Sequence, residues 1–266
     1  MKLLLILALS AFMVNAQAQN KTTNMKEQSI SMTQEWDKTF PLSEKVNHEK
    51  VSFKTQYGFT LAADLYIPKN AKGKMKAIAV SGPFGAIKEQ CSGLYAMTMA
   101  ERGFITLAFD PSFTGESSGE PRRTASPDIN TEDFLAAVDY FSMRDDVDAD
   151  KIGIIGICGW GGIALNAAAA DPRIKATASM TMYDMSRVNG NGYFDADNNE
   201  EARFAARKVL ADERITELSA SSHIIKTGLL YFSASLEATM PITPMCQSFL
   251  YKTIAYSSVS CEFSYI

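Results

Sequence analysis

Residues 152–170 have the sequence IGIIGICGWGGIALNAAAA. The apolar residues 152–155 are typical of a strand that is buried on both faces in a parallel sheet. A glycine-rich segment follows at 156–162, and the alanine-rich residues 163–170 favour a helix that Asp171 and Pro172 end. The stretch therefore predicts a strand, a sharp turn and a helix in direct succession.

Cys158 stands at the tip of this predicted turn, with glycine at positions 156, 159, 161 and 162. A nucleophile on such a turn has a strained backbone, and larger neighbours would collide with it. The start of the following helix favours a thiolate through its dipole and its unpaired N–H groups. We expect Cys158 to be a catalytic nucleophile. The local sequence is equally compatible with a small cysteine that is buried at the end of a central strand.

The surrounding chain alternates between strand and helix patterns. Residues 51–55 and 60–67 alternate around a Tyr-Gly turn, which predicts an antiparallel hairpin. Further patterns predict strands at 76–80, 105–109 and 176–182, a helix at 88–102 and a helix that begins at Asn130 or Thr131. This order predicts an α/β fold with a mostly parallel central sheet and right-handed crossovers.

The loop after the strand at 76–80 has the sequence SGPFG at residues 81–85. In a sheet that carries a nucleophile turn, N–H groups of this loop and of the residue after the nucleophile stabilise negative charge on an acyl oxygen. We expect Gly159 to supply one N–H group and Phe84 or Gly85 the other. The alternative interpretation of the loop is an ordinary turn.

Three motifs, in this order, resemble α/β-hydrolases of the dienelactone-hydrolase-like and bacterial YcjY-like kind. They are SGPFGAIKEQ at 81–90, LAFD at 107–110 with GESSG at 115–119, and GICGWGG at 156–162. The resemblance covers about residues 46–207 and implies helices on both faces of the sheet. It also implies an esterase-type or lactone-cleaving enzyme for a small acyl substrate, in which Cys or Ser attacks the acyl carbon and an acid-oriented His moves the proton. Trp160 departs from the small residue usual at that position.

The resemblance places an acid and then a His after the nucleophile. His223 is the single histidine downstream of Cys158 and is the candidate base, although it precedes the next expected strand at 228–232. Asp184 is the candidate acid, and its alternative role is that of a turn residue at a strand end. We expect His48 to be a surface residue.

Four further charged residues lie within the three motifs. Asp110 and Glu116 follow the predicted strand at 105–109, so we expect them to shape its loop. Lys88 and Glu89 stand where the helix pattern starts, so we expect them to begin that helix.

The composition changes at residue 212. Residues 212–266 hold ten serines in 55 positions, a single glycine and two of the four cysteines. We expect a frameshifted or truncated gene product here, which would leave the sheet incomplete and the chain weak or inactive. The alternative is a divergent C-terminal half, in which residues 224–232 resemble the seventh strand and Glu237 stands near the acid position.

The first 18 residues are typical of a secretory signal peptide. Lys2 precedes the apolar residues 3–14, and Ala-Gln-Ala at 16–18 predicts a cleavage site. The apolar run is shorter than the roughly 20 residues that span a membrane, so we expect export to the periplasm or medium rather than the alternative, a retained anchor. The expected divisions are the signal peptide 1–18, a polar lead 19–45, a hydrolase core 46–211 and the tail 212–266.

Composition excludes several other classes of protein. The 266 residues carry 26 basic and 30 acidic side chains, a net charge of −4, which disfavours nucleic acid as a partner. Cysteines at 91, 158, 246 and 261 form no close-spaced disulfide framework, and the two distant histidines predict no zinc site. We expect no cofactor, and the sequence gives no indication of oligomeric state.

Three functions remain compatible with these patterns. The first is an exported hydrolase that cleaves an ester, lactone or related acyl bond through Cys158. The second is a non-catalytic exported binding protein on the same scaffold, for which ligand binding would be insensitive to Cys158→Ala. The third is a redox role for Cys158 with Cys91, which the resemblance places near the same pocket.

Overall fold

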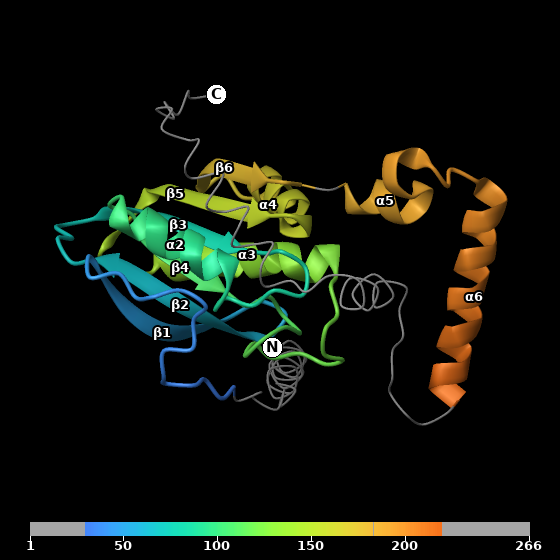
Figure 1. Cartoon of the computed structure of the whole chain (residues 1–266), viewed down its shortest axis with the longest axis horizontal. Coiled ribbons are helices and arrows are strands. Elements are labelled where there is room, and N and C mark those ends of the chain that lie inside the picture. Colours follow the sequence, from blue (N-terminus) through green and yellow to red (C-terminus); the bar gives the residue numbers. More distant parts are fainter. Residues whose placement is uncertain (1–29, 183, 220–266) are drawn as a thin grey trace, which may run out of the picture.

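The computed structural model describes residues 30–182 and 184–219, which form a mixed six-stranded sheet with helices on both faces (Figure 1). The strand order is β1-β2-β4-β3-β5-β6. Neighbours among β4, β3, β5 and β6 run parallel, whereas β1 and β2 join antiparallel. The strands are β1 Val46–Lys54, β2 Thr60–Pro68, β3 Met75–Ser81, β4 Ile105–Phe109, β5 Val147–Ile157 and β6 Ile174–Met180. The predicted α/β class with a mostly parallel sheet is confirmed.

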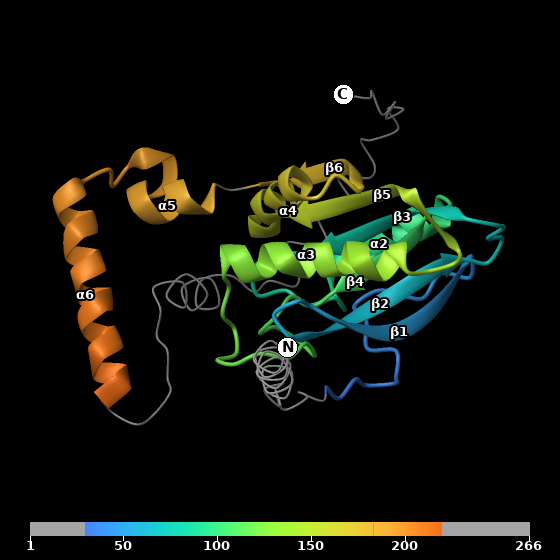
Figure 2. The ribbon, with the colours of Figure 1, turned by 180° about the vertical axis from the view of Figure 1, so that it is seen from behind.

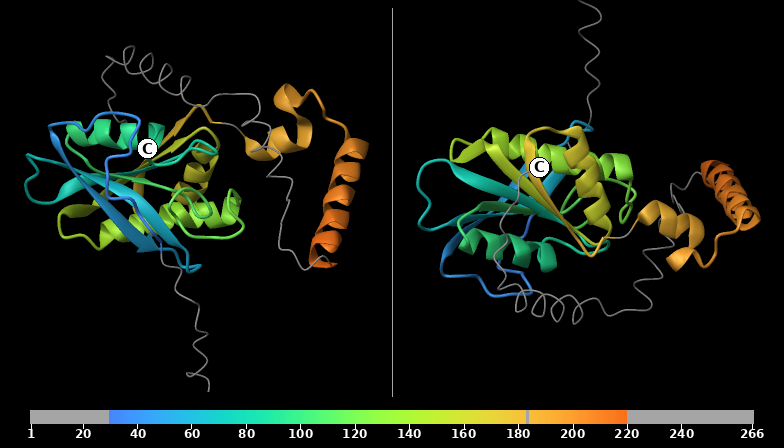
Figure 3. Two further views of the ribbon diagram at one scale, coloured as in Figure 1. Left: turned by 60° about the horizontal axis from the view of Figure 1, so that its bottom comes forward. Right: turned by 90° about the horizontal axis from the view of Figure 1, so that it is seen from above.

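Two apolar layers hold the sheet between its helices. One face is covered by α3 (Pro127–Ser142) and α4 (Gly159–Ala170), and the other by α2 (Cys91–Glu101), as Figures 2 and 3 show. Strand β4 is buried along its whole length and divides its side chains between the layers. Ile105, Leu107 and Phe109 enter the α3–α4 layer, while Ala108 enters the α2 layer. This alternation is the two-residue period of a strand that is covered on both sides.

The two long crossover helices begin elsewhere than the sequence predicts. Helix α2 starts at Cys91 rather than at position 88, because the side chain of Lys88 is turned into a buried ion cluster. Helix α3 starts at Pro127 with Ser126 as its N-cap, and proline is well suited to a first helical position. Asn130 lies inside this helix, where its amide donates to Asp133, so the predicted start at Asn130 or Thr131 is wrong.

The segment before β1 packs on the core. Phe40 is buried in the α2 layer, and a β-carbon at Gly93 of α2 would lie 3.0 Å from its ring. The side chain of Lys38 is fully buried beside Asp64 of β2. Strand β1 itself begins at Val46, five residues before the predicted hairpin strand, because its first residues pair with the end of β2.

A helical arm follows β6 and stands apart from the sheet in both opposite views (Figures 1 and 2). It consists of α5 (Met185–Asn191), a 3-10 turn (Tyr193–Asp195) and α6 (Glu200–Ser219), which runs across position 212. Within the described part of the chain, none of the helices is both long and apolar enough to cross a bilayer. The expected seventh strand at 224–232 lies outside the described residues, and β6 is the last strand of the sheet among those described.

Candidate active site

Cys158 occupies the turn between β5 and α4. Its backbone has φ 58° and ψ −124°, in the positive-φ region that residues with a β-carbon rarely adopt. The residue is the N-cap of α4, so its side chain lies at the positive end of that helix. The strained turn expected from the glycine pattern is therefore present, and strain of this kind is found at functional sites.

Two glycines permit this turn through close approach. A β-carbon at Gly156 would overlap the carbonyl oxygen of Trp160, so β5 and α4 can meet only if position 156 has no side chain. A β-carbon at Gly159 would overlap the ring of Phe84. The second contact brings the loop after β3 against the first residue of α4, which is the juxtaposition that two oxyanion donors require.

Trp160 fills the space beside this loop. Its ring centroid lies 4.6 Å from that of Phe84 at an interplanar angle of 86°, an edge-to-face contact. The indole is only 3% exposed and belongs to the α3–α4 layer. Its Nε1 has no hydrogen-bond acceptor among the described residues. The departure from a small residue at this position is therefore accommodated by burial against Phe84.

Cys91 holds the first part of the same loop. Its Sγ–H donates to the carbonyl oxygen of Gly82, with sulfur and oxygen 3.7 Å apart. Cys91 is buried in the α2 layer, and the partly buried Cys158 packs against the same layer. Both cysteines thus lie around the loop that starts at Gly82, which keeps the redox pairing a testable prediction.

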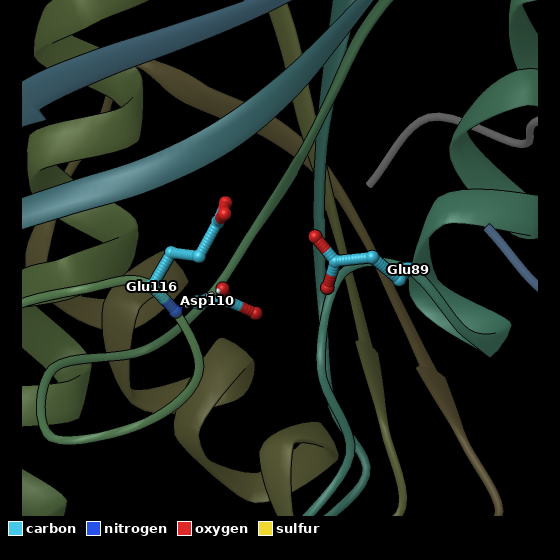
Figure 4. A group of neighbouring side chains, drawn as sticks. All are labelled: Glu89, Asp110 and Glu116. Atoms are coloured by element: carbon cyan, nitrogen blue, oxygen red, sulfur yellow. Dashed lines mark hydrogen bonds between the residues drawn. The ribbon is translucent and has the colours of Figure 1, made fainter. Parts of the chain in front are cut away.

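The end of this loop takes part in an ion cluster that the sequence did not predict, whose three carboxylates are shown in Figure 4. The Nζ of Lys88 lies 2.5 Å from Glu89, 3.0 Å from Asp110 and 2.7 Å from Glu116. The three carboxylates bring oxygens within 4.8 Å of one another, a spacing that would suit a metal ion. The Lys88 ammonium already contacts all three, so it occupies the position between the carboxylates that a metal ion would take.

Burial and charge act against each other in this cluster. Burial lowers the pKa of Lys88, but Asp110 and Glu89 outweigh it and hold that pKa above its ordinary value. Burial raises the pKa values of Asp110 and Glu89 even though Lys88 lies beside both. Burial also acts on Glu116, where the hydrogen bond from Lys88 prevails and lowers the pKa. One feature of the sequence could have indicated this cluster: Lys88 is a charged residue that stands between two buried segments.

Of the two predicted partners of Cys158, Asp184 is the one that lies within the described residues. Asp184 is exposed and caps α5, where it accepts from Ser186 Oγ at 2.7 Å and from Arg187 N at 3.0 Å. The hydrogen bond from Ser186 is the first cause of a lowered pKa for Asp184. His223 lies outside the described residues, so its role as a base stays a prediction.

His48 is not the surface residue that the sequence predicts. It lies within β1, and its Nε2 pairs with the fully buried Asp64 at 2.7 Å. Strands β1 and β5 are four places apart in the sheet, about 19 Å at the usual strand spacing. His48 is therefore too far away to accept a proton from Cys158.

Comparison with known proteins agrees with this geometry. A sequence model described as PET hydrolase-like matches residues 40–191. The uncharacterized protein PA2218 of Pseudomonas aeruginosa is 65% identical over 175 residues, which are 65% of this chain and 46% of that protein. The uncharacterized protein YcjY of Escherichia coli is 36% identical over 207 residues, 76% of this chain and 62% of that protein. The chain thus spans about half to three-fifths of the length of these relatives.

Solved structures show the same relationship. The crystal structure of PA2218 is similar with a TM-score of 0.70 and 59% identity, covering 73% of this chain and 60% of that one. The α/β hydrolase GrgF of a Penicillium species is similar with a TM-score of 0.58 and 25% identity, covering 72% of this chain and 66% of that one. On its sequence and its fold, the chain belongs to the PET hydrolase-like family of the α/β-hydrolase superfamily.

Proposed function

We propose that the chain carries the nucleophile and the oxyanion site of a hydrolase for esters, lactones or related acyl bonds. The observation that carries the proposal is the backbone of Cys158, which has φ 58° at the junction of a buried strand and a helix N-terminus. The match to a family of hydrolases also supports the proposal, because a fold alone does not determine which reaction a protein catalyses. The contact between Phe84 and Gly159 supports it by placing two backbone segments around one position.

The reaction begins when the Cys158 thiolate attacks the acyl carbon. The carbonyl π electrons move to the oxygen, and the N–H groups of Gly159 and of Phe84 or Gly85 donate to this oxyanion. When the carbonyl re-forms, the bond to the leaving group breaks and a thioester remains on Cys158. Water then attacks the thioester, which releases the acid and restores the thiol.

Deacylation is the slow step in this proposal. General-base help is worth roughly 10²- to 10⁴-fold, and the candidate base His223 precedes the strand expected at 228–232, whereas the resemblance places the His after that strand. Asp184 as the orienting acid is part of the same proposal. We therefore expect a burst of acylation followed by weak turnover.

Burst kinetics with p-nitrophenyl acetate test the proposal. Wild-type protein should release about one equivalent of nitrophenolate rapidly and then turn over slowly, and Cys158→Ala should abolish the burst. Cys91→Ser is the matched control, since it removes the neighbouring thiol and keeps a hydroxyl that can donate to the carbonyl oxygen of Gly82. A burst that survives Cys158→Ala would refute the thiol nucleophile. Saturable substrate binding without a burst in either protein would favour the binding scaffold.

Export belongs to the same proposal. Residues 1–18 have the charged start, apolar run and small-residue ending of a signal peptide. Expression in a bacterium and N-terminal sequencing of the periplasmic fraction test it: a mature start at Gln19 is expected, and a start at Met1 in the cytoplasmic fraction would refute it.

A further inference from the structure

Resting on the proposed function, we propose that Asp110 and Lys88 are positioning residues for the loop that carries the second oxyanion donor. This oxyanion loop comprises residues 82–90, between β3 and α2. Neither side chain is assigned contact with substrate. Their effect on the reaction passes through the backbone of Phe84 and Gly85.

The carboxylate of Asp110 forms hydrogen bonds with the oxyanion loop and with the loop after β4. Asp110 is fully buried directly after β4, and its Oδ1 accepts from Lys88 N at 2.8 Å. Its Oδ2 accepts from Glu116 N at 2.9 Å and from Lys88 Nζ at 3.0 Å. A β-carbon at Gly115 would overlap this carboxylate, so the chain wraps closely around it. Asp110 therefore joins the oxyanion loop to the loop after β4 through three charge-assisted hydrogen bonds.

The oxyanion loop is anchored at both ends. Gly82 is held at its carbonyl by the Cys91 thiol, and Lys88 is held at its N–H by Asp110. Between these two points, Ala86 N donates to Pro83 O at 3.1 Å and closes a tight turn. Because so few residues separate the anchors, the positions of the Phe84 and Gly85 N–H groups depend on where Lys88 is fixed.

The N-terminal segment and β1 both contact the cluster at Glu116. Thr33 N donates to Glu116 Oε1 at 2.6 Å, and Lys50 Nζ lies 3.5 Å from Glu116 Oε2. Lys50 also reaches Asp37 at 3.4 Å. Glu116 thus has partners outside the oxyanion loop as well. These partners fix the position of its carboxylate, which in turn fixes the ammonium group of Lys88.

Such a cluster contributes more to the position of the oxyanion loop than to the stability of the fold. Removing several charges from water costs free energy that their mutual attraction only partly returns. Donor placement is by contrast sensitive, since an oxyanion donor must lie at about 2.7–3.1 Å from the developing charge. A shift of about 1 Å in a positioning group costs roughly 10²-fold in rate.

Two reactions of Cys158 distinguish misplaced oxyanion donors from a general disruption of the fold. Acylation by p-nitrophenyl acetate needs the oxyanion donors, whereas alkylation by iodoacetamide needs only an accessible thiolate. We expect Asp110→Asn to slow acylation by roughly 10- to 100-fold and to leave alkylation within about twofold of wild type. Asp133→Asn is the matched control, because Asp133 is an equally buried carboxylate that binds Ser112 and not the oxyanion loop.

Folding is controlled with a milder variant. Glu116→Gln alters a side chain that is 21% exposed and keeps its hydrogen-bonding shape, so it should fold and slow acylation by a few-fold with alkylation unchanged. Wild-type rates of acylation in folded Asp110→Asn and Glu116→Gln, or a parallel fall in both reactions, would overturn the positioning role.

Hydrogen–deuterium exchange distinguishes failure of this inference from failure of the proposed function. If iodoacetamide labels wild-type Cys158 but the ester does not, the nucleophile proposal fails. The rate of amide exchange at residues 82–90 then tests the positioning role without any measurement of acylation. Faster exchange in Asp110→Asn than in wild type and Asp133→Asn would support it, and equal exchange would refute it.

Discussion

The ring of Phe84 stands edge-on to the indole of Trp160, with centroids 4.6 Å apart. Phe84 belongs to the loop after β3, whereas Trp160 lies in the first turn of α4, two residues after Cys158. An aromatic contact therefore sets the separation of the two backbone segments that we propose as oxyanion donors. In the proposed mechanism, side-chain packing at this point affects acylation, although neither ring is assigned a chemical role.

The first prediction concerns the contact between Phe84 and Gly159. Gly159→Ala places a methyl group where the Phe84 ring lies, so the loop must move away from α4. We expect acylation by p-nitrophenyl acetate to fall by at least about 10-fold. Phe84→Ala removes the obstructing ring and keeps the backbone N–H, so the double variant should recover part of the loss. Stopped-flow measurement of a double-mutant cycle tests this coupling, and strict additivity would contradict it.

The second prediction compares a buried with an exposed ion pair. Lys38 is fully buried and pairs with Asp37 at 2.7 Å and Asp64 at 3.0 Å. Lys38→Met leaves Asp64 buried with less compensation and should lower the free energy of unfolding by about 3–5 kcal/mol. The matched control is Lys151→Met, since the side chain of Lys151 is 57% exposed beside Asp148 and its pair contributes about 0–1 kcal/mol. Equal losses in urea unfolding would contradict the assignment.

The third prediction is a pH dependence of stability. Burial raises the pKa of Asp133 to about 6 from 3.8, against hydrogen bonds from Ser112 and Asn130. The folded protein then binds this proton more tightly than the unfolded chain, so the stability from protonation is present below about pH 4 and lost as the pH rises to 6. Relative to Asp133→Asn, the wild type should lose about 3 kcal/mol of unfolding free energy across this window.

Urea unfolding of both proteins at several pH values measures this difference directly. Because other carboxyl groups titrate in both proteins, only the difference between wild type and variant reports Asp133. A difference that is constant from pH 4 to pH 7 would show that Asp133 ionises normally in the folded state.

The fourth prediction tests the α3–α4 layer. Phe134 is fully buried and contacts Phe109 edge-to-face at 5.1 Å. Phe134→Ala leaves a cavity in the core and should lower the free energy of unfolding by about 3–5 kcal/mol. Met143→Ala, at a side chain that is 85% exposed, should change it by less than about 0.5 kcal/mol. Similar effects of the two variants in chemical denaturation would contradict the assigned core.

Much of the fold could be predicted from the sequence because its signals are local. The run at 105–109 is apolar at almost every position, which is typical of a strand covered on both faces, and the structure buries all of β4. Helix boundaries were less predictable, since they depend on tertiary partners. Lys88 is excluded from α2 because its partner Asp110 is 22 residues away, whereas α3 begins at Pro127 on a local signal, with Ser126 as its N-cap.

The site divides in the same way. The turn at Cys158 could be predicted from the spacing of its glycines. Close packing around the turn excludes a side chain at both Gly156 and Gly159. The cluster around Lys88 could not, because pairing among charges at 88, 110 and 116 is fixed only when β3 and β4 lie side by side. The same reasoning explains His48, whose partner Asp64 lies on the adjacent strand β2.

Peptide mapping of the acylated protein identifies the residue that attacks the ester. Wild-type protein is mixed with p-nitrophenyl acetate, quenched in acid during the burst, digested and examined by mass spectrometry. We expect a single acetyl group that is removed by hydroxylamine, as a thioester is, and that maps to Cys158. An acetyl group on another residue, or no acetyl group while iodoacetamide still labels Cys158, would contradict it.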